Sequence, residues 1–409
     1  MLRIPEDRLM SVTSPRPAKA LTEIDFRSAI ERPVGTKELA QIARPGGKIA
    51  IIVDDYTRPT PTAQILPIVL SELRKVGVSF KDIVIVIGGG LHTPTAEHER
   101  PVLVGKEIVG RVEVISHDCD DDSSLVDLGS SSRGTPIKIN RRIVEADFRI
   151  CIGLIEPHQK AGFSGGAKSI VPGVAGRDAV NRNHSMRLPI REAIGTIEGN
   201  PIRADMEEIA RKVGVDFIVN AVLNDRKEVV DLVAGDLVDA HRKGVESARR
   251  TMEVEIPREA EILILSPGGH PRDINLWQTE GKGLVRAWTA AKKGSEIIVV
   301  AECERGIGDP RLENWLSDAS PEDIHARFRR EGYTLIGEKA DRLAELSEYS
   351  QLTFYSPGLD PKKLSRLPVS FTNKPQEKLD LALRKTADDS CVLVIPNAPA
   401  VLTKTRSLA

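Results

Sequence analysis

Side chains suited to proton transfer and anion binding gather in one short stretch of this sequence. His158 follows an apolar run at 150–155, Lys168 comes ten residues later, and His184 sixteen residues after that. Between His158 and Lys168 lies a glycine-rich loop, 162–167. Imidazoles act as acids and bases near neutral pH, and backbone N–H groups of such loops can bind anions. The stretch therefore predicts a catalytic or anion-binding site.

His92 stands in a comparable place, after the apolar strand expected at 82–87 and a run of three glycines. Together, His92 and His158 could flank a substrate as paired acid and base. His117 also follows a strand, but Asp118 beside it could fix it structurally, so its role stays open. The ordinary alternative for a histidine is a surface or packed side chain. We favour that alternative for His98, His241 and His325.

The glycine-rich loop resembles a P-loop only in part. A P-loop ends in Gly-Lys-Ser/Thr and runs into a helix. Here Ala167 precedes Lys168, and Pro172 interrupts the expected helix, which argues against a nucleoside triphosphatase. Gly165 and Gly166 could still line a phosphate or carboxylate site, or simply form a tight turn. Lys168 itself could be an anion partner, a nucleophile or a surface residue.

A polar turn, Asp-Asp-Tyr-Thr-Arg-Pro, follows the strand expected at 48–53. Arg58 in this turn could bind a carboxylate with both guanidinium nitrogens. The alternative is an ion pair with Asp54 or Asp55, and the sequence does not choose between the two.

The elements that must position these residues follow an α/β rhythm. Apolar strands at 48–53 and 82–87 flank a segment at 63–76 whose apolar residues recur at helical spacing. Strand, helix and strand with short joints form a βαβ unit, which predicts a parallel sheet.

The same rhythm restarts after Pro257, with strands expected at 262–266 and 296–301. The chain therefore predicts an α/β protein of two Rossmann-like domains, 1–257 binding a cofactor and 258–409 contributing to substrate binding and closure. We expect the active site in the cleft between them, where ligands usually bind.

Composition narrows the functional class. The 409 residues are 40% apolar and 29% charged with a net charge of −1, which suits a globular protein and predicts no nucleic-acid or membrane partner. No apolar run approaches the roughly 20 residues needed to cross a bilayer. The four cysteines show no CxxC spacing and no HExxH motif occurs, so neither a zinc site nor a disulfide framework is expected. We expect a cytoplasmic protein.

At these same residues the chain resembles the nickel-dependent lactate racemase family. The resemblance rests on the spacing of His158, Lys168 and His184 around an AGFSGGAK loop. It also rests on the turn that contains Arg58, on Gly-Leu-His at His92, and on later GNPIRADMEEIA and PGGHPRDIN segments. It covers most of the chain from about residue 45 to 305 and thins toward the C-terminus.

The resemblance implies a cofactor that sequence patterns alone cannot reveal. This family uses a nickel-pincer nucleotide, derived from a thiolated pyridinium mononucleotide. Lys168 would hold it covalently through a thioamide, and His184 would complete the nickel coordination. Asp55 would lie near its ribose, and Gly165 and Gly166 would belong to the same binding set. Separate maturation proteins would supply the cofactor.

The resemblance also implies an activity, racemisation or epimerisation at C2 of a 2-hydroxy acid. His92 and His158 would stand on opposite sides of the substrate as paired acid and base while the C2 hydrogen moves as a hydride. Arg58 would bind the substrate carboxylate, and Gln278 would contact the substrate.

Three positions depart from the pattern of the lactate enzymes. Trp277 stands where they have tyrosine, and Gly281 stands where they have a substrate-binding lysine, so Lys282 is left as a candidate substitute. Glu338 aligns with a tryptophan. A carboxylate in place of an apolar wall predicts a larger or more polar substrate than lactate, such as a sugar acid.

Three alternatives stay open beside this hypothesis: a lactate racemase proper, a P-loop-like nucleotide-binding protein, and a non-catalytic carrier of nickel or of the cofactor. The carrier would need Lys168 and His184 but not the pair of His92 and His158, so the presence of all four favours an enzyme. The oligomeric state cannot be inferred from the sequence.

Overall fold

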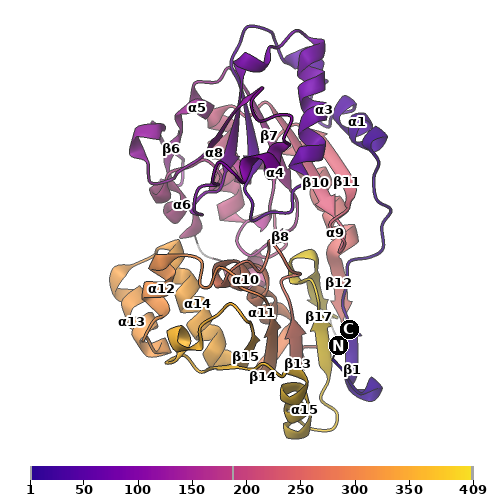
Figure 1. Ribbon diagram of the computed structural model, residues 1–409, viewed down its shortest axis with the longest axis vertical. Coiled ribbons are helices and arrows are strands. Elements are labelled where there is room, and N and C mark those ends of the chain that lie inside the picture. Colours follow the sequence, from indigo (N-terminus) through magenta and orange to yellow (C-terminus); the bar gives the residue numbers. More distant parts are fainter. Residues whose placement is uncertain (1, 187, 407–409) are drawn as a thin grey trace. The chain divides into compact units, whose positions relative to one another are not determined.

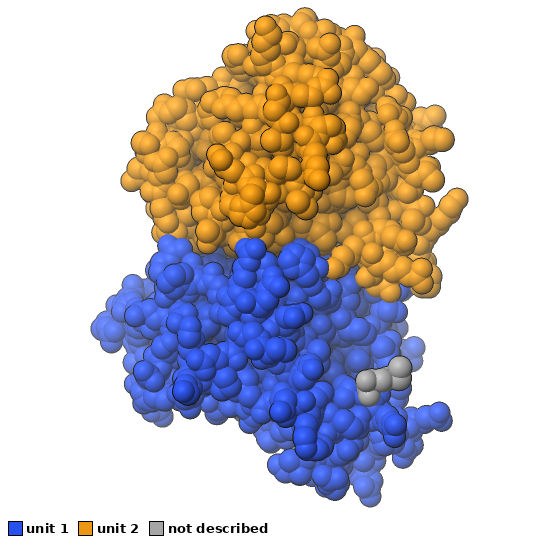
Figure 2. All heavy atoms as spheres, viewed as in Figure 1, with its two compact units in different colours: residues 1–16, 252–409 blue, residues 17–251 orange. Residues whose placement is uncertain are grey.

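The structure, a computed structural model, describes residues 2–186 and 188–406. The chain forms two compact units, shown in different colours in Figure 2. Unit 2 comprises Pro17–Thr251, and unit 1 combines Met1–Arg16 with Met252–Ala409. Each unit contains its own six-stranded sheet with helices around it (Figure 1). The predicted fold class, two α/β domains with parallel sheets, is confirmed.

The division of the chain differs from the expected boundary after residue 257. Strand β1 (Leu9–Val12) pairs in parallel with β17 (Val392–Ile395), so the first residues belong to unit 1 rather than to the N-terminal domain. Strand β12 (Glu253–Ile256) likewise pairs with β18 (Leu402–Thr405) in unit 1. Both assignments depend on backbone pairing between distant segments, which local patterns do not reveal.

The sheet of unit 2 has the order β11-β10-β7-β2-β3-β4, and only β11 runs antiparallel to its neighbour. Its central strands are continuous buried apolar runs, as expected where helices cover both faces. The strands are β2 (Ile49–Asp54), β3 (Ile83–Gly88), β4 (Glu113–Ser116), β7 (Phe148–Leu154), β10 (Phe217–Leu223) and β11 (Val229–Gly235).

Strand order in this sheet reverses between β2 and β7. The chain moves outward from β2 through β3 to β4, then returns to the other side of β2 as β7 and continues to β10. Such a reversal opens a crevice at the carboxyl ends of the two central strands, where α/β proteins bind ligands. The crevice in unit 2 therefore lies where β2 and β7 end.

The helices of unit 2 follow from capping and periodicity. Helix α8 (Pro201–Val213) begins at Asn200, whose side chain accepts from two backbone N–H groups, and ends at Gly214 with φ +84°. The others are α1 (Glu23–Glu31), α2 (Leu39–Ile42), α3 (Thr62–Lys75), α4 (Arg100–Val104), α5 (Arg141–Val144), α6 (Arg177–His184), α7 (Ile190–Ala193) and α9 (Asp239–Met252). Short hairpins β5–β6 (Leu125–Ser130, Pro136–Asn140) and β8–β9 (Pro157–His158, Gly162–Phe163) complete the unit.

The sheet of unit 1 has the order β1-β17-β13-β14-β15-β16 and all its pairings are parallel. Its strand order reverses between β13 and β17. The remaining strands are β13 (Ala260–Leu265), β14 (Ala291–Val300), β15 (Gln351–Tyr355) and β16 (Val369–Phe371). The helices are α10 (Leu276–Lys282), α11 (Ala287–Ala290), α12 (Pro310–Leu316), α13 (Pro321–Glu331), α14 (Leu335–Tyr349) and α15 (Pro375–Lys385).

Each unit has its own apolar core, in which sheet residues pack against neighbouring helices. Within residues 2–186 and 188–406, no helix combines the length and apolar character that a membrane crossing requires.

Candidate active site

Four of the predicted residues, Asp55, Arg58, His92 and Lys168, share one electrostatic environment near the carboxyl edge of the unit 2 sheet. Asp54 ends β2, and its Oδ2 accepts from the backbone N–H of Leu154 at the end of β7, at 3.1 Å. The hydroxyl of Thr60 donates to the same oxygen at 2.6 Å. Burial raises the pKa of Asp54, although Thr60 and nearby cations act in the opposite direction. Asp54 thus ties together the two strands that bound the crevice.

Asp55 and His92 form a hydrogen-bonded pair at the ends of β2 and β3. The distance from His92 Nδ1 to Asp55 Oδ2 is 2.7 Å. Asp55 Oδ1 accepts from the hydroxyl of Thr57 at 2.6 Å, so both carboxylate oxygens are engaged. Burial alone would raise the pKa of Asp55, but the charge and hydrogen bond of His92, with Arg58 and Thr57, outweigh it and lower that pKa.

The surroundings of His92 favour its neutral imidazole form. Burial lowers its pKa more than Asp55 raises it, and the positive charges of Arg58 and Lys168 lower it further. A carboxylate can only accept, so the hydrogen on the ring lies on Nδ1 and the lone pair lies on Nε2. His92 is thus built as a proton acceptor.

Arg58 lies beside this pair. Its Nη1 donates to the hydroxyl oxygen of Thr57 at 2.7 Å, and its charge lowers the pKa of both Asp54 and Asp55. The guanidinium is half-buried, which suits recognition of an anionic ligand next to an imidazole. The structure therefore places the expected carboxylate-binding side chain next to the expected base.

His158 sits in the hairpin between β8 and β9. Its Nδ1 accepts from the backbone N–H groups of Lys160 and Ala161, each at 3.2 Å. The ring is half-buried. Two backbone N–H groups thus orient the ring of this histidine.

The glycine-rich loop is fixed by two buried side chains from outside it. The guanidinium of Arg203 donates to the carbonyl oxygens of Ala161 and Gly165, both at 3.2 Å, and to that of Phe163. His241 Nε2 donates to the carbonyl of Ser164 at 2.9 Å. Burial lowers the pKa of Arg203 to about 10 and holds that of His241 well below its usual range.

Gly165 and Gly166 are required by packing and backbone conformation. Both have positive φ, +77° and +58°. A Cβ on Gly165 would lie 2.8 Å from Asn220 Oδ1, and one on Gly166 would lie 2.9 Å from the ring of His241. The N–H of Gly166 already donates to Asn220 Oδ1 at 2.8 Å. The N–H of Gly166 is thus hydrogen-bonded within the protein, whereas a P-loop would offer such an N–H to phosphate.

Lys168 lies in a single 3-10 turn, Gly166–Ser169, and not at the start of a long helix. This geometry departs from a P-loop in the way that Pro172 predicted. Lys168 is half-buried, and its charge lowers the pKa of both Asp54 and His92. The lysine therefore shares one electrostatic environment with the crevice residues.

His184, the last residue of α6, has the surroundings of a metal ligand. It is buried, and its Nδ1 is 3.0 Å from Asn183 Oδ1. Asn183 Nδ2 donates to Asp205 Oδ2 at 2.8 Å, which fixes the amide so that its oxygen faces the imidazole. His184 Nδ1 then carries the hydrogen and Nε2 carries a lone pair, the arrangement that metal-bound histidines show.

A metal at His184 would need ligands from outside the chain. Within the part of the chain that the structure describes, a single group of three His, Cys, Asp or Glu donors lies close enough to hold an ion, and it is Asp118, Cys119 and Asp120. That group excludes His184 and contains two exposed carboxylates. The donor set at His184 thus fits a metal carried by a cofactor better than a metal held by protein alone.

The expected substrate-contacting residues of unit 1 lie on α10 and α14. Trp277, Gln278 and Lys282 are buried on α10, and Glu338 is buried on α14. Residues four apart share a helix face, so Lys282 lies on the same face as Gln278. The hydroxyl of Tyr333 donates to Glu338 Oε2 at 2.9 Å.

A buried ion network connects these two helices. Glu280 on α10 pairs with Lys339 at 2.8 Å and with Arg342 at 2.7 Å, both on α14. Lys339 also donates to the carbonyl of Trp277 and lies 5.0 Å from the centre of its ring system. Burial opposes the charge on Arg342, but Glu280 and Glu338 outweigh it and raise its pKa. The carboxylate at position 338 is thus accompanied by buried cations.

Two histidines that the sequence left open or set aside are buried and hydrogen-bonded within unit 2. His117 Nε2 donates to the carbonyl of Ala175 at 3.1 Å, and its Nδ1 lies 3.3 Å from Asn140 Nδ2, while the charge of Asp118 acts to raise its pKa. His241 clamps the glycine-rich loop. Sequence reasoning missed the residues that orient the site, since short polar side chains carry no periodic signal. They are Thr57, Asn183, Arg203, Asp205 and Asn220.

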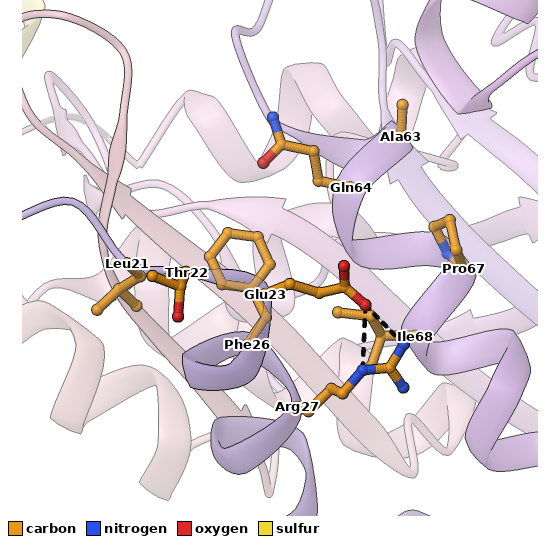
Figure 3. A pocket seen from close by; sticks show the side chains of 9 residues that line it. All are labelled: Leu21, Thr22, Glu23, Phe26, Arg27, Ala63, Gln64, Pro67 and Ile68. Carbon is orange, nitrogen blue, oxygen red and sulfur yellow. Dashed lines mark hydrogen bonds and ion pairs between the residues drawn. The ribbon is translucent and has the colours of Figure 1, made fainter.

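The pocket drawn in Figure 3 lies elsewhere in unit 2, between α1 and α3. It has a volume of about 300 Å³ and is lined by apolar side chains such as Phe26 and Ile68, with the ion pair of Glu23 and Arg27 at its edge. It contains none of the residues expected to do chemistry.

Comparison with known proteins gives two family matches. Residues 1–195 match the family described as lactate racemase N-terminal domain, and residues 256–403 match the lactate racemase C-terminal domain. Together these matches cover most of the chain.

Curated relatives and solved structures agree with these matches. The chain is 31% identical to a lactate racemase of Thermoanaerobacterium thermosaccharolyticum over 98% of this chain and 96% of that protein. It is 31% identical to one of Lactiplantibacillus plantarum over 92% and 89%. The structure of the lactate racemase apoprotein from T. thermosaccharolyticum matches with a TM-score of 0.88 at 31% identity, covering 98% and 96% of the two chains. A Thermotoga maritima protein matches with a TM-score of 0.76 at 19% identity, covering 95% and 99%, which shows the fold alone.

Proposed function

Because this chain belongs to the lactate racemase family, we propose that it inverts the configuration at C2 of a 2-hydroxy acid, with His92 and His158 as paired acid and base. The observation that carries this proposal is the Asp55–His92 pair, which lies beside Arg58 and within the field of Lys168 at the crevice of a doubly wound sheet. A carboxylate-oriented imidazole next to an arginine suits proton transfer at a hydroxyl group next to a substrate carboxylate.

We propose that Lys168 and His184 hold a nickel-pincer pyridinium mononucleotide, covalently through Lys168. His184 fits the nickel because its Nδ1 hydrogen is engaged by Asn183, which leaves the Nε2 lone pair as donor. When bound, that cofactor would accept the C2 hydrogen as a hydride and return it. Asp55 was expected near the ribose, but its engagement with His92 and Thr57 favours a role in orienting the base.

The chain's own residues would handle the remaining steps. Arg58 binds the substrate carboxylate, and His92 Nε2 takes the hydroxyl proton as the C2 hydrogen leaves. Asp55 then faces the imidazolium that forms. His158 stands at the other side of the substrate oxygen. Cofactor-synthesis proteins are the expected partners.

For the substrate, we propose a 2-hydroxy acid that is larger or more polar than lactate, such as a sugar acid. Glu338 and Tyr333 offer hydrogen bonding where the lactate enzymes are expected to have an apolar wall, and Gln278 and Lys282 share a helix face near Trp277. A panel of 2-hydroxy acids tests this directly. If lactate racemises fastest, the chain is a lactate racemase proper and the substrate proposal fails.

The test of the chemistry is mass spectrometry of the peptide containing Lys168, with nickel analysis, on protein produced together with the cofactor-synthesis machinery. We expect a covalent adduct on Lys168 and bound nickel. Unmodified Lys168 without nickel, under conditions that load a relative, would instead favour a different use of the crevice. His98→Ala, at an exposed histidine, is the matched control for His184→Ala, which should lose nickel.

A further inference from the structure

Resting on the function proposed above, we infer that the two histidines are not interchangeable in the resting protein. His92 presents a lone pair at Nε2 and takes the substrate's hydroxyl proton. His158 presents a hydrogen at Nε2 and donates a hydrogen bond to the substrate oxygen. The protein therefore begins its cycle with one prepared base, and the first turnover favours one enantiomer.

The tautomer of His92 follows from what surrounds its Nδ1. The neighbouring Asp55 Oδ2, at 2.7 Å, belongs to a carboxylate and can only accept. The other oxygen of Asp55 already accepts from the hydroxyl of Thr57, at 2.6 Å, and from its N–H, at 3.3 Å. Asp55 is 3% exposed, so this carboxylate depends on His92 and its protein neighbours for hydrogen bonds. The ring must donate from Nδ1, which leaves the lone pair on Nε2.

The tautomer of His158 follows from the opposite arrangement. The backbone N–H groups of Lys160 and Ala161 approach its Nδ1, and an N–H group can only donate. Nδ1 must therefore accept, and the hydrogen of the neutral ring lies on Nε2.

The turn that supplies these two donors cannot easily rotate to offer a carbonyl instead. The carbonyl of Lys160 accepts from Asn200 Nδ2 at 2.7 Å, and that of Ala161 accepts from Arg203 Nε at 3.2 Å. The ammonium of Lys160 donates to the carbonyl of His184 at 3.2 Å. The hairpin is thus held from three sides in the orientation that points N–H groups at His158.

This difference has a consequence for proton transfer. The proton that leaves the substrate hydroxyl ends on His92 Nε2, and the imidazolium so formed lies against the Asp55 carboxylate. For His158 to give its Nε2 hydrogen to the product oxygen, its Nδ1 must take up a proton from water, which displaces two backbone hydrogen bonds. His92 then releases the proton that it took to water, and the His158 ring returns to its resting tautomer by exchange with water. The enantiomer whose hydroxyl faces His92 therefore reacts first from the resting protein, although the final equilibrium between enantiomers is unaffected.

The tautomers can be observed without turnover. Long-range proton–nitrogen correlation spectra of the full-length protein labelled with ¹⁵N-histidine, recorded at about pH 8, distinguish hydrogen on Nδ1 from hydrogen on Nε2. The variants His92→Asn and His158→Gln assign the two signals by their disappearance. We expect the Nδ1–H form for His92 and the Nε2–H form for His158. His241, which donates from Nε2 to Ser164, is the internal reference. The same tautomer at both residues, or averaging at either, would overturn the inference.

A second measurement uses the cofactor-loaded protein and a matched pair of variants, His92→Gln and His158→Gln. Glutamine keeps a donor near the Nε2 position but cannot take a proton. In rapid-quench experiments with each enantiomer, His158→Gln should retain conversion of one enantiomer to the 2-keto acid within about tenfold, while His92→Gln loses about a thousandfold. Equal losses contradict the inference. If the loaded wild type converts no 2-hydroxy acid, the proposed function fails while the spectra still decide the tautomers.

Discussion

The sheets of units 1 and 2 share one topological feature, but the residues around it differ. In each sheet the strand order reverses between two central parallel strands, β2 and β7 in unit 2 and β13 and β17 in unit 1. At the first reversal the strand ends bring together Asp54, the buried Asp55, His92 and the charge of Lys168. At the second, Arg272 donates to Asn397 Oδ1 at 3.0 Å and joins the two strand ends. The same fold feature thus carries the proposed chemistry in one unit and a hydrogen bond between strand ends in the other.

The charged side chains of the two units differ in the same way. In unit 2, His92, His158 and His184 each have a hydrogen-bond partner at Nδ1. In unit 1 the buried carboxylate of Glu280 pairs with two buried cations, Lys339 and Arg342. We therefore expect substitutions in unit 2 to remove activity with little loss of stability, and substitutions in the unit 1 network to remove stability first.

The largest effect should come from the base. His92→Asn keeps a donor near Asp55 but removes the Nε2 lone pair, so kcat should fall about a thousandfold, or about 4 kcal/mol. The unfolding temperature should stay close to that of the wild type. His98→Asn, at an exposed position, is the control. Retained activity in His92→Asn would break the contrast between the units, because the crevice would then not hold the base.

The next effect concerns the unit 1 network. Glu280→Gln leaves Lys339 and Arg342 buried with no full negative charge between them, which should cost about 3 kcal/mol of unfolding free energy. Denaturant unfolding measures it. The matched control is Glu313→Gln, which removes the surface pair with Lys363 and should cost at most about 1 kcal/mol. Equal costs would show that the network does not stabilise unit 1 as we propose.

A smaller effect should appear at the metal ligand. Asn183→Ala removes the amide oxygen that accepts from His184 Nδ1, so the ring loses its fixed tautomer. Nickel affinity of the loaded protein should drop about tenfold or more. Competition with a chelator measures this nickel affinity. Asp178→Ala, an exposed residue in the first turn of the same helix, should leave nickel binding unchanged.

The effect of losing a single hydrogen bond at Glu338, the proposed specificity position, should be smaller still. Tyr333→Phe removes the donor to Glu338 and should cost about 1 kcal/mol of stability. It should also change the ratio of kcat/KM between polar and apolar 2-hydroxy acids without abolishing turnover. An unchanged ratio would place Glu338 outside substrate recognition.

The smallest effect is a pH dependence confined to unit 1. His325 Nδ1 lies 2.7 Å from Asp341 and its Nε2 lies 3.1 Å from Glu348. Burial lowers the pKa of His325, but the two carboxylates outweigh it and raise that pKa. Its stabilising contribution is then fully present below the unfolded pKa of about 6.5 and is lost as pH rises through the folded value.

The variant His325→Gln measures that contribution. The difference in unfolding free energy between wild type and variant should be about 0.5 kcal/mol at about pH 5.5 and should shrink toward pH 9. A difference that grows with pH would contradict the assigned sign.

Much of this molecule follows from local sequence. The apolar run at 83–87 is continuous because parallel central strands are buried on both faces, and the strand expected at 82–87 is present as β3. The spacing of His158, Lys168 and His184, with the turn at Arg58, identified the family. Pro172 correctly argued against a P-loop helix.

Tertiary structure alone decided the rest, because it depends on atoms from segments far apart in the chain. Strand β1 joins unit 1 through pairing with residues more than 380 positions away. Which ring nitrogen of His92 or His158 carries hydrogen depends on whether its neighbour is a carboxylate or a backbone N–H, and no sequence spacing encodes that choice. The sequence determined which groups are available for chemistry. The fold determined which of them are hydrogen-bonded to one another, as Asp55 is to His92, and which neighbours shift their pKa values.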